Sequence, residues 1–368
     1  MSRLSKSEAL PMGIERPIAQ ENKKAPSTAI EGWDPAAANI FNNSSILITG
    51  ATGSFGKMFI KTLFERYQPR RVAVFSRDEL KQYEMQNDAV FQREEMRFFI
   101  GDVRDERRLD LALRGVDYVI HAAALKHVTA AEYNPFECIR TNVLGAENIV
   151  HAAIQQGVKK VIALSTDKAA SPINLYGASK LASDKIFVAA NNLSGADGTK
   201  FAVVRYGNVV GSRGSVVPFF QKLINEGADS LPITDERMTR FWITLQQGVD
   251  FVMSSIAMMN GGEVFVPKIP SMRITDLAAA LAPDMATHIV GIRPGEKLHE
   301  VMVPIDDART TIELKDRYVI EPVFAWWNRV SYLAQGAQPV DEEFTYSSDK
   351  NDDWLDPKAL RAMLGLEQ

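Results

Sequence analysis

The sequence predicts an α/β protein with a doubly wound parallel sheet and a smaller, interleaved second lobe. Short apolar runs recur between residues 45 and 204, and longer amphipathic stretches separate most of them, which is typical of parallel βαβ units. The runs are almost continuously apolar, as expected for strands that are buried on both faces. The predicted strands are residues 45–49, 71–75, 97–100, 118–121, 161–164 and 201–204.

The pattern divides the chain into four predicted parts. Residues 1–43 are polar and lack a sustained period, so we expect a flexible N-terminal extension. The strand–helix alternation spans residues 44–210. Proline and glycine then interrupt it, and residues 211–345 are assigned mainly to a smaller lobe, in which residues 263–266 are a candidate strand of the main sheet. Residues 346–368 are expected to wrap around the molecule.

Composition excludes several classes of protein. The net charge of -4 leaves no broad basic surface, so we expect no nucleic-acid partner. No apolar stretch approaches the roughly 18 residues of a membrane span, so no membrane association is expected. Cys138 is the single cysteine, which rules out an intramolecular disulfide, favours the cytoplasm and argues against a Cys-type zinc site. We therefore expect no metal.

A glycine-rich loop follows the first predicted strand. The run Gly50-Ala-Thr52-Gly53-Ser54-Phe55-Gly56 ends that strand and opens the first predicted helix. Glycines in this setting allow a tight turn and a close approach of a pyrophosphate to backbone N–H groups at the helix N-terminus. A purely structural turn is the alternative, but the flanking strand and helix favour a dinucleotide site.

The residues after the second predicted strand indicate which dinucleotide is bound. An NAD enzyme usually places an acidic residue about 20 positions after the fingerprint, to hold the ribose 2′-hydroxyl. Ser76 and Arg77 stand there instead, and a hydroxyl with a guanidinium suits a 2′-phosphate, so we expect NADP. Asp78 follows directly, and a shift of one residue would reverse this prediction.

The ends of the next two strands supply further candidate cofactor residues. Asp102 and Val103 follow the third strand, where Asp102 is either a ligand of the adenine amine or a helix N-cap. His121 ends the fourth strand and is interpreted as a packed side chain. Small residues follow it and allow a cofactor to lie against the backbone; they are Ala122, Ala123 and Ala124.

Tyr176 and Lys180 are four residues apart and share one face of a predicted helix. A nearby ammonium and a cationic cofactor ring would lower the pKa of the phenol. The phenolate would then take a proton from a substrate hydroxyl while the carbon gives up a hydride. Downstream of a dinucleotide fingerprint, this pair indicates an oxidoreductase-type active site.

These motifs together resemble the extended short-chain dehydrogenase/reductase superfamily, which has a Rossmann fold. The match includes the three glycines of the fingerprint, Asn142-Val-Leu-Gly145, the Tyr176/Lys180 pair and Arg205-Tyr-Gly-Asn208. Within the superfamily, Thr166-Asp167-Lys168 is similar to the soluble inverting UDP-N-acetylglucosamine 4,6-dehydratases of pseudaminic acid biosynthesis. The similarity spans about residues 44–360.

The resemblance implies roles for individual residues. Thr166, Asp167, Lys168, Tyr176 and Lys180 are the expected catalytic group, and Tyr176, Lys180 and Asn142 also belong to the expected cofactor site. Thr166 would bind the substrate as well. The other expected substrate-binding residues are Lys126, Asn208, Arg213, Arg240, Arg293 and Glu296. Arginine suits this task because its planar fork matches phosphate oxygens.

Three features separate this chain from its relatives. The 4-epimerases of the superfamily lack the Asp167-Lys168 pair. Retaining hexose dehydratases have Thr-Asp-Glu where this chain has Lys168, and the membrane-attached branch has methionine in place of Tyr176. A UDP-sugar 4-epimerase or a retaining 4,6-dehydratase is the alternative. A non-enzymatic NADP-sensing regulator is a remote alternative, because such a protein would be expected to lack the Tyr/Lys pair, which is intact in this chain.

The resemblance also implies a reaction. The substrate UDP-N-acetylglucosamine is oxidised at C4, loses water across C5 and C6, and is inverted at C5. The product is UDP-2-acetamido-2,6-dideoxy-β-L-arabino-hex-4-ulose, and the NADP is regenerated in each turnover. Lys168, with a pKa depressed by burial and neighbouring cations, would take the C5 proton, and Asp167 would protonate the leaving hydroxyl; the reverse assignment of acid and base is the open alternative. Family members form homo-oligomers, often hexamers, and the same is expected here.

Overall fold

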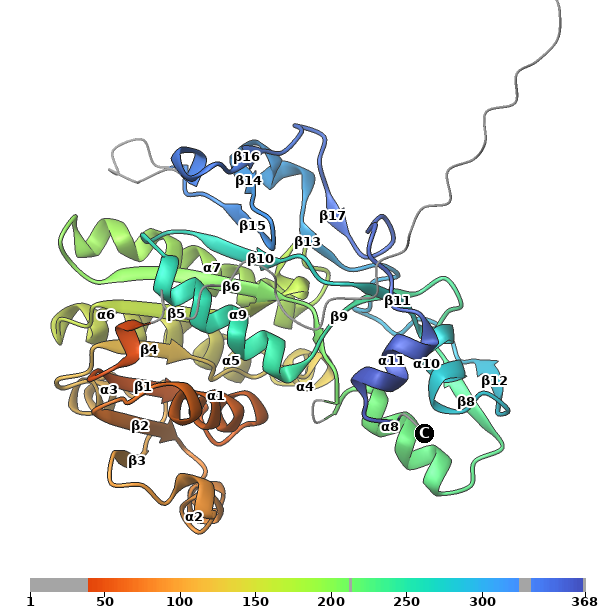
Figure 1. Cartoon of the computed structure of the whole chain (residues 1–368), viewed down its shortest axis with the longest axis horizontal. Helices are drawn as coiled ribbons and strands as arrows, with labels where there is room; N and C mark the ends of the chain where they lie inside the picture. Colours follow the sequence, from red (N-terminus) through yellow and green to blue (C-terminus); the bar gives the residue numbers. More distant parts are fainter. Residues whose placement is uncertain (1–38, 212–213, 324–331, 367–368) are drawn as a thin grey trace, which may run out of the picture.

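A ten-stranded sheet is the central feature of the computed structural model (Figure 1). The structure describes residues 39–211, 214–323 and 332–366. The parallel strands lie side by side in the order β3 (Met96–Ile100), β2 (Arg71–Ser76), β1 (Ser45–Thr49), β4 (Tyr118–His121), β5 (Lys160–Thr166), β6 (Lys200–Tyr206) and β10 (Val264–Pro267). The progression reverses between β1 and β4, so the expected doubly wound α/β class is confirmed.

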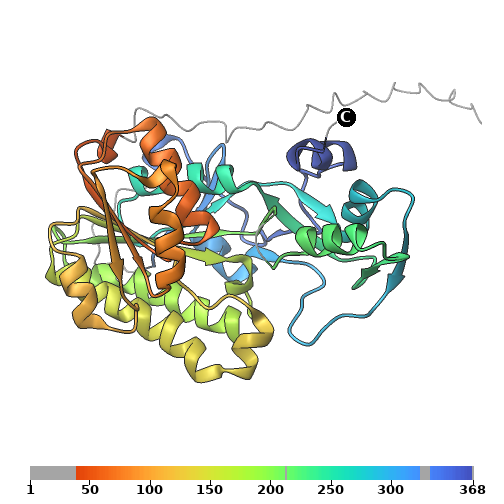
Figure 2. The same ribbon diagram turned by 90° about the horizontal axis from the view of Figure 1, so that it is seen from below.

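Helices cover both faces of the sheet, as a second view shows (Figure 2). On one face, α1 (Ser54–Arg66) packs against α9 (Leu245–Met258). On the other, α6 (Gly145–Gln155) contacts both α3 (Glu106–Ala112) and α7 (Leu175–Ser194). All five residues of β1 are buried between these layers, which explains why the strand is apolar throughout. Shorter helices follow β2 and β4; they are α2 (Glu79–Gln86), α4 (Val128–Tyr133) and α5 (Pro135–Ile139).

A second lobe lies beside the carboxyl ends of the parallel strands (Figure 1). Its elements are α8 (Val216–Asn225), β8 (Ser230–Ile233), β9 (Thr239–Ile243), β11 (Ser271–Arg273), α10 (Ile274–Leu281), β12 (Ala286–Ile289) and α11 (Pro357–Met363). The short strand β7 (Asn208–Val209) leaves the main domain and pairs with β9. The lobe has an apolar core of its own around Phe220, Trp242 and Leu277, so it is a separate packing unit.

The two packing units are interleaved along the chain. Strand β10 returns to the main sheet and overlaps the candidate strand at residues 263–266. The antiparallel strands β15 (Arg317–Ile320), β14 (Thr311–Glu313) and β16 (Gln338–Pro339) also join this sheet, beyond β10, although the sequence pattern assigned them mainly to the small lobe. Strand β15 pairs with β10 and so covers the backbone edge that β10 would otherwise expose.

The C-terminal segment contacts both packing units. Strand β17 (Tyr346–Ser347) pairs with β13 (Val301–Val303), and α11 packs against α10. The Tyr346 hydroxyl donates a 3.0 Å hydrogen bond to the carbonyl of Ile269. The segment therefore links strand β13, which adjoins the cleft described below, to the outer surface of the second lobe.

Phe41 belongs to the core, although it lies within the segment expected to be a flexible extension. It is fully buried in a short helical turn before β1, and its ring centroid lies 6.3, 5.2 and 6.3 Å from those of Phe59, Tyr67 and Tyr118. Residues 1–38 of the expected extension lie outside the described residues. The packed part of the chain thus includes residues before the predicted boundary at 44, because Phe41 closes one end of the apolar core.

Replacing Phe41 tests this assignment. Phe41→Ala should lower the free energy of unfolding by about 3–5 kcal/mol, because it removes a fully buried ring and leaves a cavity. Guanidinium denaturation followed by circular dichroism measures the change. Leu80→Ala removes a side chain that is 65% exposed and should change stability by less than about 0.5 kcal/mol. Equal stability of both variants would show that the turn is not part of the cooperative core.

Candidate active site

A cleft of about 1320 Å³ runs along the carboxyl ends of the parallel strands and is lined by residues of both packing units. Connections that leave β1, β2, β4, β5 and β6 form the wall on the side of the main sheet. Residues near α8, β9 and the segment before β13 form the opposite wall. A cleft outside the carboxyl ends of the strands, near the reversal of strand order, is the usual ligand site of this architecture.

The glycine loop lies at one end of the cleft, and its glycine positions leave no room for a side chain. Gly50 adopts a φ of +66°, and a Cβ there would approach the Cα of Ala123 to 3.0 Å. A Cβ on Gly56 would lie 2.4 Å from the Cα of Ala51, so this glycine allows α1 to pack against the end of β1. Helix α1 begins at Ser54, and Gly50 and residues 52–55 of the loop line the cleft. The N–H groups of Gly50 and Gly53 donate to the carbonyls of Phe75 and Gly50, so the loop instead offers an anion the N-terminus of α1, whose first-turn N–H groups have no acceptor within the helix.

Most of the predicted cofactor residues line the cleft. They are Gly50, Thr52, Gly53, Ser54, Phe55, Ser76, Arg77, Asp102, Val103, Ala122, Ala123, Ala124, Tyr176 and Lys180. Gly56 and Asn142 do not line it. The buried amide of Asn142 bonds both the N–H and the carbonyl of Leu125 and the hydroxyl of Ser179, so it fixes the loop after β4 against α7.

The region after β2 carries cations at its surface. The Arg77 guanidinium is about half exposed and lies 3.8 Å from the Asp102 carboxylate. The Thr52 and Ser76 hydroxyls are 3.1 Å apart. Asp78 is the N-cap of α2: its carboxylate accepts the Lys81 N–H at 3.0 Å and forms a 2.6 Å ion pair with the Lys81 ammonium. Asp78, the residue that left the cofactor preference in doubt, is thus occupied as a helix cap.

Asp102 does not cap the helix that follows it. Asp105 is the N-cap of α3, whereas the Asp102 carboxylate accepts hydrogen bonds from the Arg104 guanidinium at 2.7 and 3.0 Å. Burial alone would raise the pKa of Asp102, but the bonds from Arg104 outweigh it and lower this pKa. The helix-cap alternative for Asp102 is therefore wrong, and the side chain stays at the edge of the cleft.

His121 is a packed residue, as expected. The Thr49 hydroxyl accepts the N–H groups of Ala122 and Ala123 at 3.1 Å each, so its own proton points to His121 Nδ1 at 2.9 Å. Complete burial lowers the pKa of His121 to about 3, so the ring stays neutral. Thr49 and His121 together fix the alanine backbone that lies against Gly50.

The predicted catalytic residues come together where β5 ends. Thr166 is the last residue of β5, and Asp167–Ala169 form a 3₁₀ turn. The Asp167 Oδ1 atom accepts hydrogen bonds from the Thr166 hydroxyl at 2.8 Å and from the Lys168 ammonium at 3.0 Å. Asp167 is fully buried and does not itself line the cleft, and its Oδ2 atom has no hydrogen-bond partner among the described residues. The turn thus holds a buried carboxylate and an ammonium as a contact pair.

Helix α7 brings the phenol to this pair. Asn174 caps the helix by accepting the Gly177 N–H, and Tyr176, in the first turn, lines the cleft together with Thr166 and Lys168. Burial raises the pKa of Tyr176 to about 12, and the Lys168 charge and the Thr166 hydrogen bond offset this only in part. The expected low pKa of the phenol is thus not a property of the protein alone. Lys180, one turn along the helix, is buried as well, and burial lowers its pKa.

Lys168 differs from its expectation. Burial alone would lower its pKa, as the sequence analysis assumed, but the Asp167 and Glu300 carboxylates outweigh burial and raise it. Lys168 therefore carries a proton at neutral pH. Its ammonium lies 3.4 Å from Glu300 Oε1 and 3.5 Å from the Asn208 amide oxygen.

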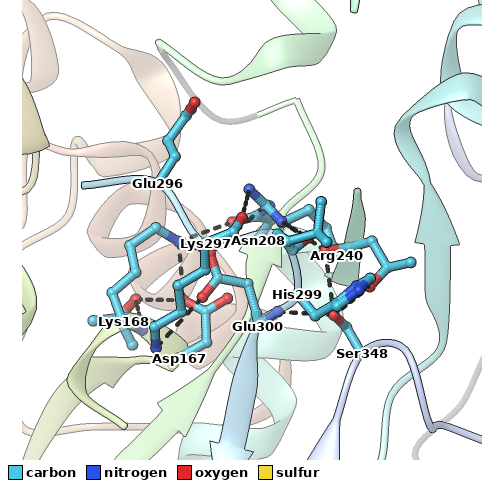
Figure 3. A network of polar contacts seen from close by, with 12 residues as sticks. Asp167, Lys168, Asn208, Arg240, Glu296, Lys297, His299, Glu300 and Ser348 are labelled. Atoms are coloured by element: carbon cyan, nitrogen blue, oxygen red, sulfur yellow. Dashed lines mark hydrogen bonds and ion pairs between the residues drawn. The ribbon is translucent and has the colours of Figure 1, made fainter. Parts of the chain in front are cut away.

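Glu300 is the site residue that the sequence analysis missed. It lines the cleft beside Lys168, and its Oε1 atom lies 3.6 Å from Arg240 Nε (Figure 3). Lys297, also missed as a site residue, lies 4.0 Å from Glu300 Oε2. Sequence spacing carries no signal for these contacts, because Lys168 and Glu300 are far apart in the chain and no shared helix or strand brings them together. Lys297 and Glu300 follow the Arg293-Pro-Gly-Glu296 motif closely in the sequence, and this nearness was the signal that could have identified them.

The predicted substrate residues occupy different positions around the cleft. Asn208, Lys126, Arg293 and Glu296 line it, and Arg293 is exposed with Glu296 at 3.9 Å. Arg240 lines it too, but its guanidinium donates to the carbonyls of Thr239, Lys297 and Leu298, so it also holds the opposite wall. Arg213 lies outside the described residues.

Two further findings concern the described part of the chain. Residues 39–211, 214–323 and 332–366 contain no group of three or more His, Cys, Asp or Glu side chains arranged to hold a metal ion. None of the helices in these ranges combines the length and the apolar content that crossing a bilayer requires.

Comparison with known proteins assigns this arrangement to a family. The UDP-N-acetylglucosamine 4,6-dehydratase (inverting) of Campylobacter jejuni subsp. jejuni serotype O:2 is 59% identical over 326 residues, which cover 87% of this chain and 97% of that protein. A UDP-glucose 4-epimerase from Rickettsia canadensis is 39% identical, over 82% of this chain and 89% of that protein.

Solved structures agree with the sequence relatives. The X-ray structure of Pen from Bacillus thuringiensis superposes with a TM-score of 0.80 at 34% identity and covers 89% of this chain and 99% of that one. A dTDP-glucose 4,6-dehydratase from Streptomyces venezuelae, with a TM-score of 0.62 at 24% identity over 69% of this chain and 86% of that one, shares the fold. The family described as polysaccharide biosynthesis protein matches residues 46–322. This chain belongs to the polysaccharide biosynthesis protein family.

Proposed function

We propose that this protein is a UDP-N-acetylglucosamine 4,6-dehydratase that inverts C5 and forms UDP-2-acetamido-2,6-dideoxy-β-L-arabino-hex-4-ulose. One observation carries the proposal: the buried Asp167 and the partly exposed Lys168 form a contact pair beside the Tyr176 phenol, in a cleft that begins at a dinucleotide-type glycine loop. Relatives with this printed activity are 59% and 57% identical over 87% of the chain, which supports the same reaction here.

The glycine loop and the cations after β2 suit a nicotinamide dinucleotide. Gly50 and Gly53 would let the pyrophosphate approach the N-terminus of α1, because these glycines keep the loop narrow; a side chain at Gly50 would meet Ala123. We propose NADP, with Arg77 and Ser76 as the 2′-phosphate ligands, because the nearby acid Asp78 is held in the α2 cap. When bound, this cofactor accepts the hydride of C4 and returns it to C6. Lys180, buried beside Tyr176 and lining the cleft, would bind the cofactor as well.

The first proton transfer is assigned to Tyr176 and Thr166. Tyr176 would take the proton of the 4-hydroxyl, and the Thr166 hydroxyl would orient that oxygen. Because burial disfavours the phenolate, this step depends on positive charge near the phenol, and Lys168 is a cation that already lowers the pKa of Tyr176.

The elimination is assigned to the Asp167–Lys168 pair. At rest Lys168 is an ammonium that donates to Asp167 Oδ1 at 3.0 Å. Transfer of this one proton along the hydrogen bond yields a neutral amine and a carboxylic acid. The amine then takes the C5 proton, the C5–H electron pair forms the C5–C6 double bond, the C6–O bond breaks, and the Asp167 proton leaves with the 6-hydroxyl as water. One shared proton thus supplies both the base and the acid.

A UDP-sugar 4-epimerase is the second candidate, since relatives with that printed name are 38–39% identical. An epimerase needs proton transfer only at the 4-hydroxyl, which Tyr176 and Thr166 would supply. It has no use for a buried acid–base pair at the end of β5, so the Asp167–Lys168 contact favours the dehydratase. A retaining dehydratase would share the elimination but restore the original C5 configuration.

The division of labour between the parts of the chain follows the same proposal. Residues 44–210 would bind the cofactor, residues 211–345 would mainly bind the substrate, and residues 346–368 would wrap around both. The substrate would contact Lys126, Asn208, Arg213, Arg240, Arg293 and Glu296. The product would enter pseudaminic acid biosynthesis.

We also propose a cytoplasmic homo-oligomer, with a hexamer as the expected assembly. Two large apolar side chains on consecutive helices support a buried subunit interface: Tyr133 near the end of α4 is 87% exposed, and Phe136 in α5 is 75% exposed. Light scattering of the purified full chain would give its mass in solution, and a monomer would contradict this assembly.

Turnover in deuterated water tests the proposed reaction. The purified chain, NADP⁺ and UDP-N-acetylglucosamine in D2O should give a 6-deoxy-4-keto sugar with deuterium at C5 and the L-arabino configuration, as seen by NMR. A 4-keto product with the D-xylo configuration would leave the dehydratase but remove inversion. UDP-N-acetylgalactosamine as the product would make the enzyme an epimerase.

Replacing Asp167 tests the shared proton. Asp167→Asn should slow product formation by about 100-fold or more, the usual contribution of a general acid–base group. Oxidation at C4 should continue, because Tyr176 and Thr166 remain, so the absorbance of reduced nicotinamide should accumulate. Asp197→Asn changes an exposed carboxylate in the turn after α7 and is the matched control. Normal turnover by Asp167→Asn would remove Asp167 from the elimination.

Replacing Arg77 tests the cofactor preference. Arg77→Ala should weaken NADP⁺ binding about tenfold, because it removes a charge-assisted contact worth about 1.5 kcal/mol. NAD⁺ binding, which involves no 2′-phosphate, should change little. Calorimetry of both nucleotides measures the ratio, and Arg107→Ala, an exposed arginine of α3, is the control. An unchanged ratio would contradict the assignment of Arg77 to the 2′-phosphate.

A further inference from the structure

Glu300 is a buried carboxylate that the proposed reaction does not yet use. It precedes β13, is 2% exposed and lines the cleft. Three cations from three separate segments face it: Lys168 at 3.4 Å, Arg240 at 3.6 Å and Lys297 at 4.0 Å (Figure 3). Its Oε2 atom is buried without a hydrogen-bond partner among the described residues. Burying a carboxylate costs several kcal/mol, so a position like this one requires compensation by charge.

Lys168 is the point at which Glu300 meets the chemistry. The Lys168 ammonium contacts two carboxylates, Asp167 at 3.0 Å and Glu300 at 3.4 Å, and the Asn208 amide oxygen at 3.5 Å. Arg240 opposes its charge from β9. Tyr176 of α7 feels the same charge. Lys297 donates to the carbonyl of Ala170, just after the turn that holds Lys168, and interacts with Lys168 and Asp167 through their charges.

We propose that Glu300 is a positioning residue: it fixes the Lys168 ammonium beside Asp167 and prevents the single proton of the Asp167–Lys168 pair from being lost to water. The inference rests on the proposed function, in which one proton moves from Lys168 to Asp167. This transfer makes Asp167 the acid and leaves Lys168 as a free amine. A pair without this proton has no acid for the leaving hydroxyl. Glu300 supplies negative charge that favours the protonated pair, and Arg240 and Lys297 compensate the buried carboxylate from 3.6 and 4.0 Å.

The C-terminal segment holds Glu300 in place through Ser348. The buried Ser348 hydroxyl accepts the Glu300 N–H at 2.9 Å, and the Ser348 N–H donates to the Glu300 carbonyl at 2.8 Å. The hydroxyl of Thr239, at the start of β9, is hydrogen-bonded to the Ser348 hydroxyl at 2.7 Å and to His299 Nδ1 at 2.8 Å. The backbone at Glu300 is thus fixed from β9 and from the end of β17 (Figure 3).

The pH dependence of Glu300→Gln tests the proposal. Glu300 favours the protonated form of Lys168, so its removal lowers the pKa of Lys168, and the pair loses its proton at a lower pH. The alkaline limb of the kcat profile should move down by about one pH unit or more, and kcat should fall about tenfold or more through misplacement of the ammonium. NADP⁺ binding and KM for the UDP-sugar should stay within about twofold of wild type, a change of less than about 0.5 kcal/mol.

The step that is slowed distinguishes a role at Lys168 from general damage. In single turnovers, Glu300→Gln should oxidise C4 at nearly the wild-type rate, while deuterium exchange at C5 in D2O slows about tenfold or more. An alkaline limb at the wild-type pH would overturn the proposal, and so would equal slowing of both steps. A wild-type enzyme that forms no dehydrated product would instead defeat the proposed function, which separates the two failures.

Ser348→Ala keeps the proposal testable if Glu300→Gln fails to fold. This variant retains the carboxylate but removes the hydroxyl that fixes the Glu300 N–H, so the alkaline limb should move in the same direction by a smaller amount. Ser347→Ala, the neighbouring buried serine of β17, is the matched control, because Ser347 pairs with Val301 and not with Glu300. Identical pH profiles of Ser348→Ala and Ser347→Ala would contradict the positioning role.

Discussion

The parallel alignment of β1, β4, β5 and β6 is the constraint on which the rest of the structure depends. Parallel strands end at one edge of a sheet, so the glycine loop after β1, the alanines after β4 and the Thr166 turn after β5 all open into the same cleft. The reversal of strand order beside β1 leaves room there for an extended ligand. The crossover helices bury both faces and leave this edge open, and the second lobe closes it from the other side.

Charge balance decides how this cleft works. Lys168, Arg240 and Lys297 surround two buried carboxylates, so the cluster has one more cation than anions before a substrate arrives. An excess of positive charge suits a ligand that carries a diphosphate. Within the cluster the carboxylates dominate at Lys168, which they keep protonated against the effect of burial. The same arrangement disfavours a free amine at rest, so a base forms only by proton transfer inside the cluster.

The wall opposite the glycine loop depends on residues from distant parts of the chain. Arg240 of β9 holds the carbonyls of Lys297 and Leu298, and Ser348 holds the backbone at Glu300. The C-terminal segment therefore supports the cleft as well as covering the second lobe. Such a wall, assembled from segments that meet only in the folded chain, resists small displacements because each segment is hydrogen-bonded to the next.

The sequence by itself determined the features that follow from local patterns. Apolar runs identified the sheet, glycine spacing identified the glycine loop, and a spacing of four residues identified the Tyr176/Lys180 pair. Each of these patterns depends on residues within a few positions of one another. Tertiary structure decided the rest. The burial of Phe41, the recruitment of β14 to β16 into the sheet and the contact of Glu300 with Lys168 all require segments that are distant in the chain. The pKa of Lys168 belongs to this second group, because the charge that reverses the effect of burial comes in part from Glu300, a residue 132 positions away.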